Sequence, residues 1–66
     1  MSTLTKQEKQ ALQYLVNTGF NVDVAGFDDD HEPIGELLRV RLMPDYMVED
    51  DQGTLRLTAR GEEVLK

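Results

Sequence analysis

Residues 42–65, LMPDYMVEDDQGTLRLTARGEEVL, contain the pattern that decides the fold. Two short runs of β-favouring residues, 46–49 and 54–58, lie on either side of the turn-forming sequence DDQG at 50–53. Gly53 can take the positive φ that a tight hairpin turn needs. The pattern therefore predicts a β-hairpin in this part of the chain.

The second run alternates in the way that a half-buried strand does. Leu55 and Leu57 fall on one face and Arg56 on the other, because successive side chains of a strand point to opposite faces. We expect both leucines to face the core and Arg56 to face solvent.

A short helix is predicted after the hairpin. Thr58 can act as its N-cap by accepting a hydrogen bond from the first turn. Val64 and Leu65 would supply its apolar contacts. Gly61 lies inside the helix and is expected to weaken it locally, because glycine has a low helix propensity.

This stretch resembles the wing and closing helix of bacterial and phage winged-helix domains. The resemblance covers about a third of the chain, and the matching residues are Leu57, Thr58, Gly61, Val64 and Leu65. It implies a single small winged-helix-like α+β domain over residues 1–66, with two or three helices and a C-terminal hairpin. It also implies a helix-turn-helix ahead of the wing, with the second helix placed to enter the DNA major groove.

An amphipathic helix is predicted over residues 6–18. Thr5 followed by Glu8 forms a capping-box sequence, in which each residue can bind the backbone amide of the other. Five apolar residues share one face of a 3.6-residue wheel: Leu4, Ala11, Leu12, Leu15 and Val16.

The segment after this helix is predicted as a turn followed by a short strand. Gly19 can end the helix in a left-handed conformation, with Phe20 folding back on Leu15. Apolar and polar residues then alternate over residues 20–24, which indicates a strand; a helical turn is the alternative.

The acidic run DDDHE at residues 28–32 is predicted, together with Gly26, as an exposed loop. Its carboxylates and imidazole could in principle bind a divalent cation. Consecutive residues cannot all converge on one ion, so we expect a solvated charge run and no metal site.

No catalytic site is expected either. His31, the single histidine, lies within the acidic run rather than in an apolar pocket, and neighbouring carboxylates would favour its charged form. No glycine-rich phosphate loop is present in the sequence. We therefore expect a protein that is not an enzyme and binds no cofactor.

Residues 33–43 fit a second helix better than a strand. Pro33 can occupy the first helical turn and Pro44 can end the helix. Three apolar residues would share one face: Ile34, Leu37 and Leu38. In this helix Arg41 would lie near the middle of the apolar face.

The strand alternative for the same segment rests on alternation. Leu38, Val40 and Leu42 alternate with two arginines, as in a half-buried strand. In this arrangement Arg39 and Arg41 would both face outward.

The charge of the chain disfavours binding to phosphate backbones. Thirteen acidic residues against seven lysines and arginines give a net charge of −6. The candidate phosphate contacts are Arg39, Arg41, Arg56 and Arg60, although surface ion pairs with nearby acids are the commoner role. Tyr46 and Met47 are candidates for a partner interface, with the core as the alternative.

These observations favour a non-enzymatic regulatory or adaptor module that binds another protein. The alternative is a DNA-binding transcriptional regulator of winged-helix type. A chain of 66 residues buries a thin core, so a homodimer is also possible. No targeting segment or membrane span is recognisable in the sequence, and we expect a cytoplasmic protein.

Overall fold

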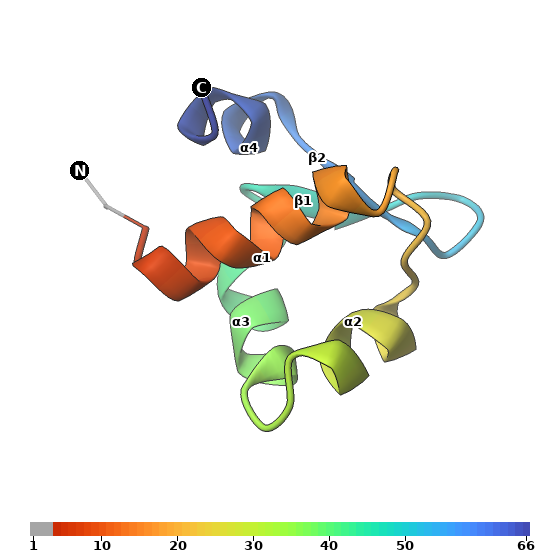
Figure 1. The fold of residues 1–66 in the computed structure, drawn as a ribbon. Coiled ribbons are helices and arrows are strands. Elements are labelled where there is room, and N and C mark those ends of the chain that lie inside the picture. The colour runs from red at the N-terminus through yellow and green to blue at the C-terminus, as the bar shows by residue number, and fades with distance from the viewer. Residues whose placement is uncertain (1–3) are drawn as a thin grey trace.

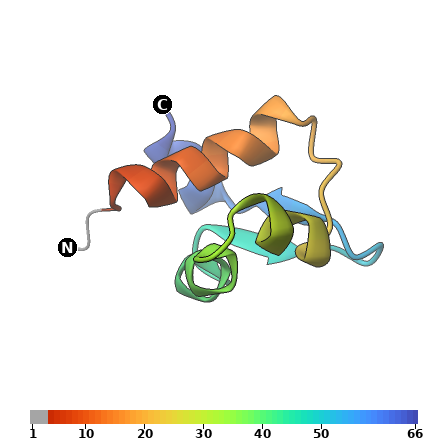
Figure 2. The ribbon, with the colours of Figure 1, turned by 60° about the horizontal axis from the view of Figure 1, so that its bottom comes forward.

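The computed structural model describes residues 4–66, which form an α+β domain of four helices and one antiparallel hairpin (Figure 1). The elements in chain order are α1 (Lys6–Asn17), α2 (Val24–Asp30), α3 (Gly35–Leu42), β1 (Met47–Glu49), β2 (Leu55–Leu57) and α4 (Ala59–Val64). Helix α1 contacts α3 and β2. Figure 2 shows α3 end-on, below α1 and beside α2.

The predicted capping box and helix stop of α1 are confirmed. The Thr5 hydroxyl accepts a hydrogen bond from the Glu8 amide at 3.1 Å, and the Glu8 carboxylate accepts one from the Thr5 amide at 2.8 Å. Gly19 has φ +69°, and the Phe20 amide donates to the Leu15 carbonyl at 2.9 Å. These bonds form a Schellman motif that turns the chain sharply after α1.

The prediction of a strand over residues 20–24 and an exposed loop over 26–32 is wrong. Asp23 caps a helix there, accepting a hydrogen bond from the Gly26 amide at 2.7 Å. Phe27 lies on the inner face of this helix and is fully buried, whereas Asp29 and Asp30 are exposed. Burial of this large aromatic ring, with Val24 packed against the same core, stabilises a seven-residue helix that ends in three aspartates.

A trace of the predicted extended backbone is nevertheless present before α2. The Leu55 amide donates to the Val22 carbonyl at 2.8 Å, and Asp23 forms an isolated bridge with Thr54. The chain therefore runs briefly beside β2 before it enters α2.

The helical prediction for residues 33–43 is confirmed by α3, with two corrections. Pro33 lies before the N-cap Ile34 and outside the helix. The core side of α3 carries Gly35, Leu38 and Leu42, all buried. Leu37 and Arg41, which the sequence pattern placed on the apolar face, are therefore exposed to solvent.

The C-terminal hairpin and helix are confirmed. Val48 pairs with Arg56 in the antiparallel register, Leu55 is fully buried, and Arg56 is exposed. The Thr58 hydroxyl accepts from the Gly61 amide at 3.1 Å, which caps α4.

Gly61 has a packing role in addition to the predicted weakening of α4. It is buried, and a Cβ at this position would collide with the Tyr46 carbonyl oxygen. Only glycine lets α4 approach the segment before β1 so closely.

The core lies between α1, the α2–α3 pair and the inner face of the hairpin. Its buried apolar residues are Ala11, Leu12, Leu15, Val22, Phe27, Leu38, Leu42, Tyr46, Met47 and Leu55.

Candidate functional site

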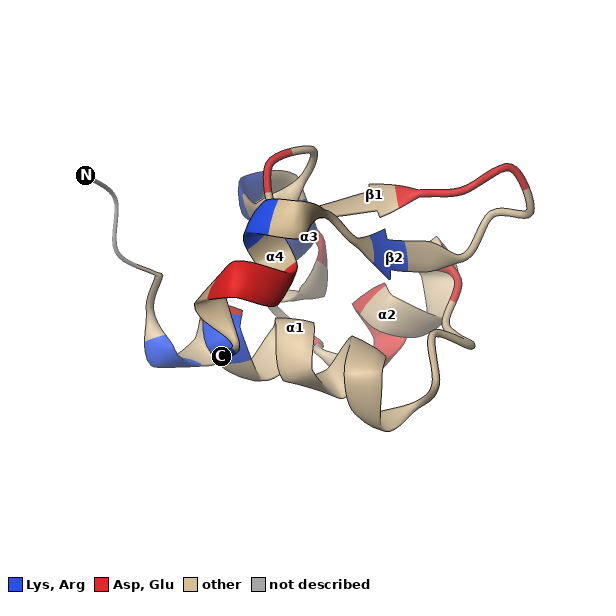
Figure 3. Ribbon diagram, turned by 90° about the horizontal axis from the view of Figure 1, so that it is seen from above, with Lys and Arg blue, Asp and Glu red and all other residues tan. Residues whose placement is uncertain are grey.

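The four candidate phosphate-binding arginines come from three different elements of the fold. Arg39 and Arg41 lie on α3, Arg56 lies on β2 and Arg60 on α4. Basic and acidic segments are interspersed along the ribbon in Figure 3. Most of these arginines are also engaged within the domain.

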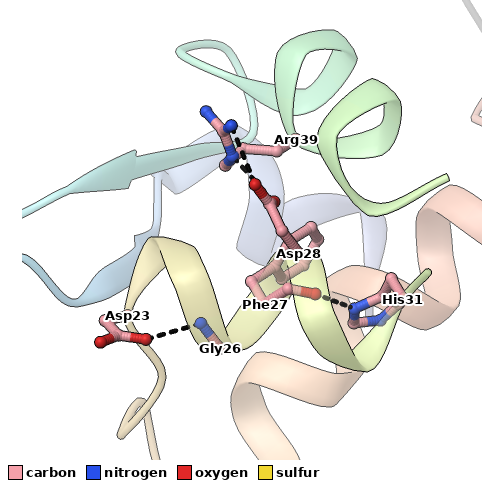
Figure 4. A network of polar contacts seen from close by, with 6 residues as sticks. All are labelled: Asp23, Gly26, Phe27, Asp28, His31 and Arg39. Carbon is pink, nitrogen blue, oxygen red and sulfur yellow. Dashed lines mark hydrogen bonds and ion pairs between the residues drawn. The ribbon is translucent and has the colours of Figure 1, made fainter. Parts of the chain in front are cut away.

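Arg39 binds Asp28 on α2 through two guanidinium nitrogens, Nε and Nη2 (Figure 4). The Nε–Oδ1 and Nη2–Oδ2 distances are 2.9 and 3.0 Å. The two side chains are 23% and 26% exposed. The hydrogen bonds that Arg39 donates to the Asp28 carboxylate raise the pKa of Arg39 above its ordinary value. A phosphate would have to displace this bidentate carboxylate to bind Arg39.

Arg56 and Arg60 contact aromatic rings as well as solvent. Arg56 Nε donates to Asp50 Oδ2 at 3.0 Å, and its guanidinium carbon lies 5.7 Å from the centre of the Phe20 ring. The Arg60 guanidinium carbon lies 5.8 Å from the centre of the Tyr46 ring. Cation–π contacts of this kind hold the cations against the domain surface.

Asp50 organises the hairpin turn that precedes Arg56. It accepts hydrogen bonds from the Thr54 hydroxyl at 2.6 Å and from the Thr54 and Gln52 amides at 2.9 Å. The Thr54 hydroxyl has the largest effect and Arg56 the next, and together with the amides they hold the pKa of Asp50 well below its usual range. Arg56 therefore helps to fix the turn.

The two predicted partner-contact residues are in the core. Tyr46 is 8% exposed and Met47 is fully buried. Burial by α4 and by the facing strand leaves almost no surface of either residue for a second protein. Of the two roles considered for them, the placement matches the core.

His31 lies in an aromatic cluster, contrary to the expectation that it stands apart from apolar groups. Its ring stacks on Phe27, with centroids 4.3 Å apart, and meets Tyr14 edge-on at 4.8 Å. His31 Nδ1 lies 2.9 Å from the Phe27 carbonyl oxygen, to which it can donate a hydrogen bond (Figure 4). The cluster fixes α2 against α1.

Tyr14 connects the same two helices through its hydroxyl. It donates a hydrogen bond to the Asp30 carboxylate, which, with partial burial, raises the pKa of Tyr14 to about 12.

An open hollow of about 540 Å³ lies beside Tyr14 and His31. Among residues 4–66, no group of three acidic or histidine side chains is arranged to hold a metal ion.

The most distinctive surface is the side of α3 that faces away from the core. Leu37 is 53% exposed and Val40 is 62% exposed. They line a shallow hollow together with Pro33 and Glu36. We call this surface, Pro33, Glu36, Leu37, Val40 and Arg41, the outer face of α3.

Sequence reasoning missed the outer face of α3. Leu37 was assigned to the core, and Val40 entered only the strand alternative. The available signal was the spacing of Gly35, Leu38 and Leu42, which places a different stripe inward, but a glycine carries no hydrophobic signal.

Comparison of the chain with family models, curated proteins and solved structures found no match. No helix within residues 4–66 has the length and apolar character needed to cross a membrane.

Proposed function

We propose that this domain is a non-enzymatic regulatory or adaptor module of the cytoplasm that binds protein through the outer face of α3. The observation that carries the proposal is the exposure of Leu37 and Val40, both more than half open to solvent. Exposed apolar residues are common singly, but two neighbours in one hollow form a patch.

The chemistry of the patch fits a protein partner better than a nucleic acid. Covering Leu37 and Val40 removes apolar surface from water, which is favourable by roughly 25 cal/mol per Å². A duplex groove offers mainly polar base edges and phosphates to such side chains. The net charge of −6 further disfavours approach to DNA.

A DNA-binding regulator of winged-helix type is the second candidate. The order of α1, α2, α3, hairpin and α4 supports it, because α2 occupies the place where a helix-turn-helix needs its first helix. Arg41 is exposed at the end of α3, and Arg60 is exposed on α4. Against it, Arg39 is held by Asp28, and α3 presents leucine and valine outward.

A capture experiment tests the protein-binding proposal. The immobilised domain is exposed to an extract of its native host, and wild type is compared with a Leu37→Ser, Val40→Ser variant. Val16→Ser is the matched control, because Val16 is an exposed apolar residue on α1, outside the outer face of α3. The proposal expects a protein retained by wild type and by the control but lost from the double variant.

Two results of the capture experiment contradict the proposal. One is a wild-type protein that retains nothing and also fails to associate with a second copy of itself at millimolar concentration. The other is retention that is equal for wild type and the double variant, with circular dichroism showing that both are folded.

A titration of labelled duplex DNA at low salt tests the second candidate. Binding that weakens steeply with salt, and weakens again in an Arg41→Ala, Arg60→Ala variant, would support DNA recognition. Absence of binding at micromolar protein would remove it.

A further inference from the structure

We infer that the partner of the outer face of α3 is a second copy of this chain, with the two α3 helices side by side and parallel. The inference rests on the proposed protein-binding function and names its partner. It comes from the charges that border the apolar patch. Glu36 and Arg41 are both exposed, and they lie on opposite flanks of Leu37 and Val40 on a 3.6-residue wheel.

The spacing of these residues matches the pairing rules of parallel helices. Leu37 and Val40 are three residues apart, as are the two core positions of a heptad. Glu36 directly precedes the first core position, and Arg41 directly follows the second. In a parallel pair, a residue that directly precedes the first core position faces the residue five places later on the other helix. Glu36 of each copy would thus meet Arg41 of the other.

The opposite orientation is disfavoured by the same charges. In an antiparallel pair with a two-fold axis across the helices, each flank faces its own equivalent. Glu36 would approach Glu36 of the second copy, and Arg41 would approach Arg41. Like charges in such positions are destabilising, so the charge pattern selects the parallel arrangement.

Arg41 is available for this contact, whereas Arg39 is not. Arg39 faces α2 and is held by Asp28. No hydrogen bond or ion pair of Arg41 is present within residues 4–66. Glu36 likewise has no ion-pair partner there at 4.0 Å or less; the nearby Arg39, which feels its charge, is paired with Asp28. The two charges are therefore open to a second molecule.

The dimer should be weak. Helix α3 has eight residues, and its apolar patch has two large side chains. A contact limited to this patch would bury far less than the roughly 800 Å² per partner of a standard interface. We expect a dissociation constant on the order of 0.1 to 1 mM, at the low end of specific association.

Sedimentation equilibrium of the full chain, from about 20 µM to 2 mM to bracket that constant, tests the inference. Glu36→Arg and Arg41→Glu should each weaken the dimer by about tenfold, because each reversal turns two attractive contacts into repulsive ones. The double reversal should restore association to within roughly threefold of wild type. Leu37→Ser should abolish it and Val16→Ser should leave it unchanged.

Each of the other results overturns the inference. A wild-type protein that stays monomeric at about 2 mM excludes the parallel pairing through α3. A dimer whose affinity neither single charge reversal changes excludes it as well. A dimer that survives Leu37→Ser places the contact elsewhere. A monomeric wild type leaves the proposed function standing, because the capture experiment tests that function separately.

Discussion

Arg39 on α3 and Asp28 on α2 form a bidentate ion pair that connects the two helices (Figure 4). The same two helices also approach closely at Gly35, where an added Cβ would collide with the Asp28 carbonyl. Arg39 is held toward α2, whereas Leu37 and Val40 of the same helix are exposed to solvent. The ion pair thus helps to set which face of α3 is available for binding.

A double-mutant cycle on Asp28→Ala and Arg39→Ala should give a coupling free energy of about 1 kcal/mol. The pair is bidentate and only about a quarter exposed, which places it at the upper end of surface ion pairs. Urea unfolding of the four proteins measures the coupling. Arg39→Lys keeps the positive charge but loses the bidentate geometry of the guanidinium, so it should retain less than half of this coupling free energy. A coupling free energy below about 0.3 kcal/mol would contradict the role given to the pair.

Alanine at either of two buried glycines should destabilise the fold by roughly 1 to 3 kcal/mol, despite its better helix propensity. A Cβ at Gly35 would collide with the Asp28 backbone, and one at Gly61 with the Tyr46 carbonyl. Gly26→Ala is the comparison, because a Cβ there meets no backbone atom and approaches only the side chains of Asp23 and Val22. Thermal unfolding should rank both core variants below Gly26→Ala; equal or higher melting temperatures would show that the close approaches are not required.

Asp50→Asn should lower the melting temperature at pH 7 and lose this effect in acid. The folded-state pKa of Asp50 is depressed below its ordinary 3.8, so its stabilisation is present above about pH 4 and is lost as pH falls through the folded value. Wild type and variant should therefore converge below pH 4. Asp51→Asn, at an exposed neighbour, is the control and should melt like wild type at both pH values. A constant difference from pH 7 to 2 would refute the assignment.

Asp30→Asn should bring the pKa of Tyr14 down from about 12 toward its ordinary 10.0. The hydrogen bond to the Asp30 carboxylate favours the neutral phenol, so its stabilisation is present below pH 10 and is lost as pH rises toward 12. NMR titration of the tyrosine ring carbons, with Tyr14→Phe for assignment, measures the shift. A Tyr14 titration that is identical in wild type and variant would contradict the bond.

Elements with local signals were predictable from the sequence. The capping box of Thr5 and Glu8, the Gly19 turn and the Thr58 cap each depend on residues within one helical turn. The hairpin likewise followed from its turn residues and from the alternation of β2. These parts of the fold are specified by neighbouring residues.

Elements that depend on distant contacts were missed. Helix α2 has only seven residues, and its one buried side chain, Phe27, lies between Gly26 and three aspartates, so its local sequence resembles a loop. Its helical state depends on burial of Phe27 and on the docking of α3 at Gly35. The inward stripe of α3 was missed for the same reason, because Gly35 matters through the backbone it admits.

The candidate site was predicted less well than the fold. The sequence singled out Arg39 and Arg56, whose carboxylate partners were not assignable, since Asp28 lies 11 positions from Arg39. It also singled out Tyr46 and Met47, which are buried in the core. Exposure of Leu37 and Val40 is a property of the assembled domain.

Occupation of the outer face of α3 by a second copy would change the surroundings of its backbone amides as the protein is diluted. Backbone amide chemical shifts recorded over a dilution series from about 2 mM to 20 µM test it most directly, because that range brackets the expected dissociation constant. We expect concentration-dependent shifts that are confined to residues 33–44 and absent from the Leu37→Ser variant. Shifts that do not change with concentration, or changes centred on the hairpin or α4, would contradict it.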